Sequence, residues 1–296
     1  MTLTHIVCPV DFSDASRHAI DQATVVAGYY HSRITALHVL TSSSDIFATT
    51  TEDAARVDAL RPRIAEDFAC AASQGIAVDI LIEPGHPADV ILERAASARA
   101  GLIVMGTHGT SGFQHLVLGS VTEKVLRKAT CPVLTVPARA RATSQLPFTR
   151  LLCAVDFSDS SLEAVRAAVS LAEGADATLT LIHVLEWPWE EPPAPSLEEL
   201  PREQAAALAE FRRYLEKSAC TRLESLVPDT MQTPRLRIRI ENGKPHREIL
   251  HAAAEERSDL IVLGVRGRNP VDLALLGSTA NQVVRRATCP VMTYRS

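Results

Sequence analysis

Short apolar runs alternate with longer amphipathic stretches along the whole chain. In the first half the runs, rich in Val, Ile and Leu, predict strands at about 4–10, 33–40, 76–82, 101–106 and 132–137. The stretches between them predict helices at about 14–28, 51–74, 87–99 and 119–128. Strands that alternate with helices through short connections form right-handed crossovers and a parallel sheet. The pattern therefore predicts an α/β fold with an open, doubly wound, five-stranded parallel sheet.

Residue types at the predicted helix ends support these boundaries. Ser13 and Asp14 are N-cap residue types ahead of the first helix, and Gly28 falls near its end. Pro87 suits the first turn of the third helix. The second half contains a similar N-cap cluster at 158–161.

The chain repeats itself once. Residues 6–13 reappear at 151–158, an offset of 145, whereas residues 102–106 reappear at 260–264, an offset of 158. A period of this length indicates a duplicated domain, with 13 extra residues between the second and third strands of the second copy. They fall in a Pro- and Glu-rich insertion near 186–200, where Trp187 and Trp189 either pack on their own domain or form a partner site.

The predicted domains are 1–138 and 149–296, each with a doubly wound sheet, joined by a linker at 139–148. Because the linker is short, we expect the domains to pack on each other. Apolar residues make up 46% of the chain and aromatic residues only 4%, which favours cores of Val, Ile, Leu and Ala.

Charge and hydropathy limit the classes of partner. A net charge of −5 without a long basic run argues against nucleic acid as a partner. No apolar run approaches the ~18 residues of a membrane span, and the first residues lack a signal-peptide pattern. We therefore expect a cytoplasmic protein.

The six cysteines duplicate with the repeat, as Cys8 with Cys153, Cys70 with Cys220 and Cys131 with Cys289. Paired positions of this kind favour small buried core residues over disulfides. No cysteine or histidine spacing typical of a metal site occurs.

A glycine-rich loop follows the fourth strand of each copy and fits the pattern G-x2-G-x9-G-Ser. Its residues are Gly106, Gly109, Gly119 and Ser120 in the first copy and Gly264, Gly267, Gly277 and Ser278 in the second. Glycines let backbone N–H groups approach a phosphate, and the final Gly-Ser opens a helix whose N-terminus favours an anion. The loop therefore predicts a nucleotide site in each copy, although a purely structural role for the glycines is the alternative.

Other residues reach the same edge of the sheet, because ligands of such folds bind at the carboxyl ends of the strands. Asp11 and Asp156 follow the first strand of each copy, and either accept from a ribose hydroxyl or cap the next helix. Val39 and Val184 at the second strand can pack on a purine. His38 and His183 are better explained as packed strand-end residues than as ligands.

With these motifs the chain resembles the universal stress protein family in its tandem form, over nearly all of both domains. The resemblance implies the strand order 3-2-1-4-5, ATP binding, and pairing of the domains through their last strands. It also implies the site residues. In the first copy they are Pro9, Val10, Asp11, Val39, Met105, Gly106, Gly109, Gly119, Ser120 and Val121. In the second copy they are Ala154, Val155, Asp156, Val184, Leu263, Gly264, Gly267, Gly277, Ser278 and Thr279.

The second loop departs from the family pattern, with Arg266 in place of His108 and Pro270 in place of Gly112, so we expect two non-equivalent pockets. No catalytic motif such as a Walker-type lysine loop is present. The sequence thus predicts an ATP-binding regulator, with Mg²⁺ as a possible companion of the nucleotide and with homodimers of whole chains. The alternatives are a nucleotide-free interaction module and a slow ATPase.

Overall fold

The computed structural model describes residues 3–41, 51–108, 118–138, 148–186, 201–227, 235–265 and 276–295, with the backbone alone at 51–54. Most of the expected linker and insertion, and the middles of both glycine loops, lie outside these residues. Gly109, Gly267, Arg266, Pro270, Trp187 and Trp189 are among the residues that are not described.

Strands and helices alternate in both halves, as the apolar pattern predicts. The first half comprises β1 (His5–Pro9), α1 (Asp14–Tyr30), β2 (Arg33–Leu40), α2 (Thr51–Asp67), α3 (Ala69–Ser73), β3 (Val78–Pro84), α4 (Pro87–Ser97), β4 (Leu102–Gly106), α5 (Ser120–Lys128) and β5 (Val133–Val136). The second half comprises β6 (Arg150–Ala154), α6 (Asp159–Ala175), β7 (Thr178–Leu185), α7 (Arg202–Glu224), β8 (Leu236–Asn242), α8 (Pro245–Glu255), β9 (Leu260–Gly264), α9 (Ser278–Arg286) and β10 (Val291–Tyr294).

One predicted helix is wrong in its extent. The segment expected as a single helix at 51–74 forms two, α2 and α3, separated at Phe68. The backbone of Phe68 (φ −99°, ψ 12°) leaves the helical range of about −63° and −42°. Its ring is fully buried in the core, so packing of this side chain accompanies the break.

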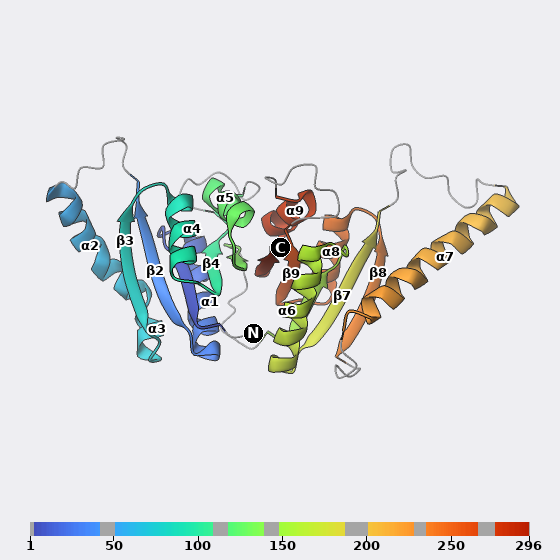
Figure 1. Cartoon of the computed structure of the whole chain (residues 1–296), viewed down its shortest axis with the longest axis horizontal. Coiled ribbons are helices and arrows are strands. Elements are labelled where there is room, and N and C mark those ends of the chain that lie inside the picture. Colours follow the sequence, from blue (N-terminus) through green and yellow to red (C-terminus); the bar gives the residue numbers. More distant parts are fainter. Residues whose placement is uncertain are drawn as a thin grey trace.

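The strands form one sheet of ten, in the order β3-β2-β1-β4-β5-β10-β9-β6-β7-β8. Within each half the order is 3-2-1-4-5 and the neighbouring strands are parallel. The two predicted five-stranded sheets are thus joined edge to edge in one continuous sheet, and the α/β class is confirmed. Figure 1 shows the halves side by side, with α2 at one outer end and α7 at the other.

The halves meet where β5 and β10 pair antiparallel. Val291 lies opposite Thr135, and Thr293 lies opposite Val133. Two buried hydroxyls cross the junction, because Thr135 Oγ1 donates to the carbonyl of Val291 (3.1 Å) and Thr293 Oγ1 donates to that of Val133 (3.2 Å). The junction therefore joins the halves by side-chain as well as backbone hydrogen bonds.

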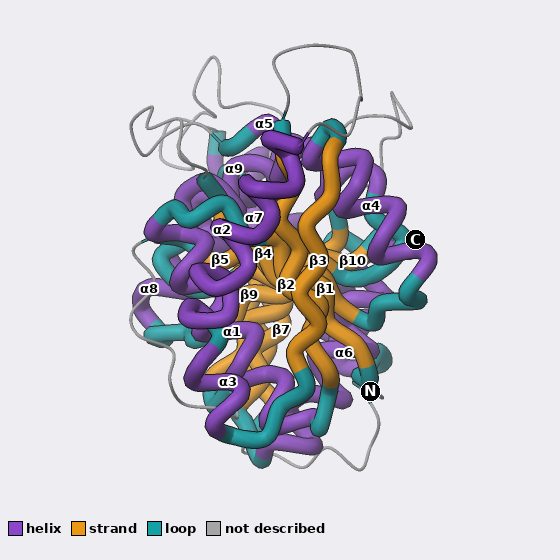
Figure 2. The backbone as a smooth tube through the Cα atoms, turned by 90° about the vertical axis from the view of Figure 1, so that its left-hand side faces the viewer, coloured by secondary structure: helices purple, strands orange, loops and turns teal. Residues whose placement is uncertain are grey.

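Helices cover both faces of the sheet, as Figure 2 shows for α1 and α3 on one side of the strands and α4 on the other. One apolar core lies beneath α1, α2, α3, α6 and α7 and contains Ala19, Phe68, Val165 and Leu223. A second core lies beneath α4, α5, α8 and α9. Each core includes residues of both halves, so the two repeats share their interior.

No described helix combines the length and the apolar character that a membrane crossing requires.

The cysteines follow the expected burial only in part. All six are free thiols, and Cys8 and Cys153 are fully buried, which raises the pKa of both thiols. Cys70, expected in the core, is instead exposed, because α3 turns that face toward solvent.

The threonine pair at the junction gives a test of its strength. Thr135→Val and Thr293→Val keep the side-chain shape but remove a buried donor, so each is expected to lower the free energy of unfolding by about 1 kcal/mol. Urea denaturation followed by circular dichroism measures the change. Thr24→Val, which removes a hydroxyl bonded within its own helix to Ile20, is the matched control. An unchanged midpoint in both junction variants would show that these hydroxyls contribute nothing to the pairing.

Candidate functional site

The loop after β1 is held by its own side chains. Asp11 Oδ1 accepts from the backbone N–H of Ser13 (3.0 Å) and from its hydroxyl (2.6 Å). Ser13 Oγ in turn accepts from the N–H of Ser16 (3.1 Å) and caps α1. The cap of α1 is therefore Ser13 and not Asp11, which instead holds the cap residue in place, and the second half repeats the arrangement with Asp156 and Ser158.

Between each aspartate and serine stands a phenylalanine in an unusual conformation. Phe12 and Phe157 both have φ of 63°, in the left-handed region that residues other than glycine seldom adopt. Strain of this kind persists only where the surroundings enforce it, and its duplication marks the loop as a shaped feature.

Gly106, at the end of β4, is required by packing rather than by a ligand. A Cβ at this position would lie 2.8 Å from the carbonyl carbon of Ala15, at the start of α1. Gly264 in the second half meets the same constraint, since its Cβ would lie 2.7 Å from the backbone nitrogen of Ser161. These two glycines let a helix start against the end of a strand.

Gly119 differs, because no described residue demands a glycine there. Its φ of −60° and ψ of 138° suit any residue, and its Cβ would only touch Thr107 O at 3.4 Å, an ordinary contact. Gly119 donates its N–H to Thr107 O (3.0 Å) and accepts at its carbonyl from Glu123 (2.9 Å). The described residues thus leave room for a side chain at the start of α5, where the sequence has none.

No described side chain caps the N-terminus of α5 or that of α9, which starts after Gly277. In contrast, α1 and α6 are capped by Ser13 and Ser158. The first backbone N–H groups of a helix have no partner within it, and the helix dipole adds a partial positive charge. Both glycine-started helices thus present an anion-binding end.

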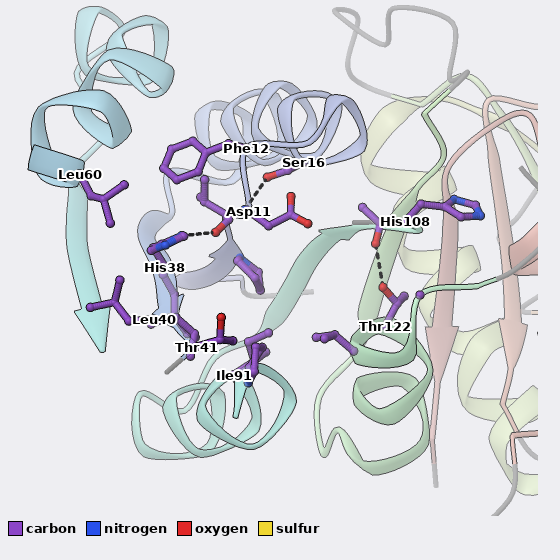
Figure 3. Close-up of a pocket in the computed structure, with 18 of the residues that line it drawn as sticks. Asp11, Phe12, Ser16, His38, Leu40, Thr41, Leu60, Ile91, His108 and Thr122 are labelled. Carbon is purple, nitrogen blue, oxygen red and sulfur yellow. Dashed lines mark hydrogen bonds between the residues drawn. The ribbon is translucent and has the colours of Figure 1, made fainter. Parts of the chain in front are cut away.

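These elements surround a pocket of about 620 Å³ in the first half. Figure 3 shows its wall, formed by the loop after β1, by β2, and by α2, α4 and α5. Its lining includes the apolar side chains of Val10, Leu37, Val39, Leu40 and Ile91, together with the first residues of α5. A pocket of this size, mostly apolar with a few polar groups, is typical of a small-molecule site.

Most of the residues predicted for the first copy line this pocket. They are Pro9, Val10, Asp11, Val39, Gly106, Gly119, Ser120 and Val121. Met105 is not part of the wall, since it is buried with 4% of its surface exposed. Gly109 cannot be placed because it lies outside the described residues.

The second-half residues occupy the corresponding positions of their elements. Ala154 ends β6, Val184 lies in β7, and Leu263 and Gly264 end β9. Val155 and Asp156 follow β6, and Gly277, Ser278 and Thr279 start α9. Gly267 lies outside the described residues.

The histidines of the second strands are packed, as predicted. His38 Nδ1 donates to the carbonyl of Val10 (2.7 Å), and its ring lies 5.1 Å from that of Phe12. His183 makes the same contacts with Val155 (2.6 Å) and Phe157 (4.8 Å).

An arginine completes a stack that the sequence analysis missed. The guanidinium of Arg63, from α2, lies 3.9 Å above the ring of Phe12, and that of Arg222, from α7, lies 3.8 Å above Phe157. Such cation–π contacts contribute about 0.5–1 kcal/mol at exposed sites. Arg63 and Arg222 are 159 positions apart, whereas the repeated segments of the sequence are offset by 145 or 158 positions. The sequence alone therefore gave no clear signal that the two arginines correspond.

Metal ligands are not clustered in the described part of the chain, where no group of three His, Cys, Asp or Glu side chains could hold an ion.

The two kinds of glycine respond differently to alanine. Gly106→Ala forces α1 away from β4 and is expected to lower the free energy of unfolding by about 1–3 kcal/mol. Gly119→Ala has room for its Cβ. This change is expected to lower the free energy of unfolding by less than about 1 kcal/mol, because alanine is a poorer N-cap residue than glycine. Thermal denaturation without nucleotide compares the two variants. Equal losses would mean that Gly119 is as much a packing residue as Gly106.

Comparisons with known proteins agree with this architecture. The model of the Universal stress protein family matches residues 2–137 and again 147–295. A universal stress protein of Thermus aquaticus is 33% identical over 148 residues, covering 50% of this chain and 99% of that protein. One of Mycolicibacterium smegmatis is 26% identical over 303 residues, covering 98% of this chain and 96% of its own length.

A solved structure shows the same fold over the full length. The crystal structure of a universal stress protein from Archaeoglobus fulgidus superposes with a TM-score of 0.69 at 23% identity, covering 100% of this chain and 99% of that one. With its family match in both halves, the chain belongs to the universal stress protein family.

Proposed function

We propose that this protein is a regulator that binds ATP, with the phosphates at the N-terminus of α5 in the first half and of α9 in the second. The observation that carries the proposal is the uncapped start of α5 at Gly119, which opens into the pocket of about 620 Å³. A helix N-terminus without a side-chain cap favours an anion, and a glycine there lets the anion come close.

The rest of the pocket suits a nucleoside. Val10, Val39 and Ile91 offer apolar contacts to a purine. Asp11 commits Oδ1 to Ser13, which leaves Oδ2 to accept from a ribose hydroxyl. Ser120, exposed at the start of α5, can donate its hydroxyl to a phosphate oxygen.

A magnesium ion fits this arrangement only as a companion of the nucleotide. Mg²⁺ in nucleotide sites takes one or two carboxylates together with phosphate oxygens and water. Among the described lining residues Asp11 is the one carboxylate, so Asp11 would supply the protein ligand while the ion neutralises phosphate charge.

The residues that line the pocket support binding of the nucleotide and not its hydrolysis. Asp11 holds two hydrogen bonds from Ser13, and His38 Nδ1 donates to a backbone carbonyl. Both side chains thus serve the shape of the loop. Nucleotide occupancy would act by ordering the glycine loops, which a partner or the junction between the halves could then detect.

The last strands of the two halves, β5 and β10, are not available for assembly of whole chains. β5 and β10 already pair with each other inside the chain, so neither edge is open to a second copy. We infer that one chain takes the arrangement that two single-domain copies would form, and that a homodimer would bury a different face.

A variant that introduces a negative charge tests the proposal. Ser120→Asp puts a carboxylate at the first position of α5. There it interacts favourably with the positive end of the helix dipole but repels a phosphate. We expect the affinity of the first site for ATP to fall by about tenfold or more. The melting temperature without nucleotide is expected to hold or rise. Isothermal titration with ATP measures the affinity, and mass spectrometry of molecules released from the purified protein identifies the natural ligand.

Ser278→Asp makes the matched change at α9, so each single variant is expected to retain one site and the double variant none. If wild-type protein releases no nucleotide and shows no heat of binding with ATP, the nucleotide-free interaction module is the better description. ATP binding that survives the double substitution would place the nucleotide elsewhere.

A further inference from the structure

Two aromatic side chains are exposed next to each other on α7. Phe211 is 51% exposed and Tyr214 is 66% exposed, and residues three positions apart are neighbours on the surface of a helix. Among the described residues, the other large exposed apolar side chain is Tyr29, whose hydroxyl donates to the carbonyl of Gly174 (2.8 Å). Exposed apolar side chains that stand singly are ordinary, whereas adjacent ones indicate an interaction surface.

The opposite side of α7 packs on its own domain. Ala219 and Leu223 are buried, and Leu223 belongs to the apolar core beneath the helix. Leu223 follows Tyr214 by nine positions, which is two and a half turns and therefore the other side of the helix. Figure 1 shows α7 at an outer end of the molecule. The aromatic side of α7 thus faces away from the sheet.

Tyr214 is part of an exposed stripe along the helix. The members of this stripe are alternately four and three positions apart, which is the spacing of helices that pair along their length. They are Glu203, Ala207, Glu210, Tyr214, Lys217 and Thr221, and all are exposed. Phe211 flanks Tyr214 on the same side of the helix. The stripe is therefore acidic before its central tyrosine, at Glu210, and basic after it, at Lys217.

This order of charges fits a second copy of the same helix in the antiparallel orientation. A two-fold axis at Tyr214 brings the two tyrosines together and places Glu210 of each helix opposite Lys217 of the other. A parallel pair would instead oppose Glu210 to Glu210 and Lys217 to Lys217, and like charges opposite each other disfavour association. The one like-charged pair of the antiparallel arrangement, Glu203 with Glu224, falls at the ends of the helices, where salt screens exposed charges.

The stripe belongs to the second half. The corresponding helix of the first half, α2, contains no aromatic residue, and Pro62 lies inside it. Pairing of α7 with α7 uses the same surface on both partners, so the contact closes after two copies and does not extend into a filament.

We propose that two copies of this chain associate through the outer side of α7, with the helices antiparallel and Tyr214 at the two-fold axis. The contact leaves the pairing of β5 with β10 inside each chain as it is. The helix has 23 residues and is about 35 Å long, so one pair of helices makes an interface at the small end of the usual range. The dimer is therefore expected to dissociate on dilution.

Sedimentation velocity of the full-length protein at several concentrations tests the proposal. We expect the wild-type protein to pass from monomer to dimer as its concentration rises. Lys217→Glu and Glu210→Lys each put two like-charged pairs in the contact, and each is expected to weaken the dimer by about tenfold or more. The double variant restores opposite charges across the antiparallel pair and is expected to recover the dimer, whereas a parallel pair would stay repulsive.

Glu66→Lys, which makes the same charge change at an exposed position of α2, is the control and is expected to leave the dimer unchanged. A wild-type protein that stays monomeric at every concentration would overturn the inference. A dimer that persists in both single variants would overturn it as well, because the interface would then lie elsewhere. The third contrary outcome concerns Phe211→Ala and Tyr214→Ala: if they lower the melting temperature of the monomer without changing the dimer, the aromatic side chains are covered by another segment of the same chain.

Discussion

The antiparallel pairing of β5 with β10 is the interaction on which the arrangement of this molecule depends. An open edge strand presents unpaired backbone groups that recruit other chains. Here each half closes the last edge of the other, and the buried hydroxyls of Thr135 and Thr293 strengthen the contact. Because both cores run across this junction, neither half has an interior of its own. Figure 1 shows α5 and α9 on either side of it, so the two candidate phosphate sites lie next to the shared strands.

The candidate sites combine strict local repetition with divergence at their margins. Asp11, Phe12 and Ser13 are reproduced as Asp156, Phe157 and Ser158, with the same hydrogen bonds and the same strained φ. Gly106 and Gly264 serve helix packing in both halves. The sequences diverge in the glycine loops, where Arg266 stands in place of His108 and Pro270 in place of Gly112.

Membership of the universal stress protein family accounts for the fold and the duplication, but the site has to be argued from its own chemistry. The distinction among the glycines illustrates this. Both described glycines of the first-half motif, Gly106 and Gly119, can be assigned to a phosphate on pattern alone. Geometry divides them, because a side chain at Gly106 would collide with Ala15 while one at Gly119 would not. A glycine that the fold does not need is the stronger indication of a ligand.

The sequence by itself determined the α/β class, the duplication and the residues at the carboxyl ends of the strands, whereas the strand order within each half was implied by the family resemblance. These follow from short-range patterns: apolar runs at Leu102–Gly106, the Ser13 cap, and a repeated glycine motif. Only the tertiary structure decided which residues of β5 and β10 face each other, that Phe68 divides a helix, and that Cys70 is exposed. It also brought Arg63 onto Phe12 across 51 positions of sequence. Each of these depends on contacts between segments distant in the chain, and periodicity carries no information about which distant faces meet.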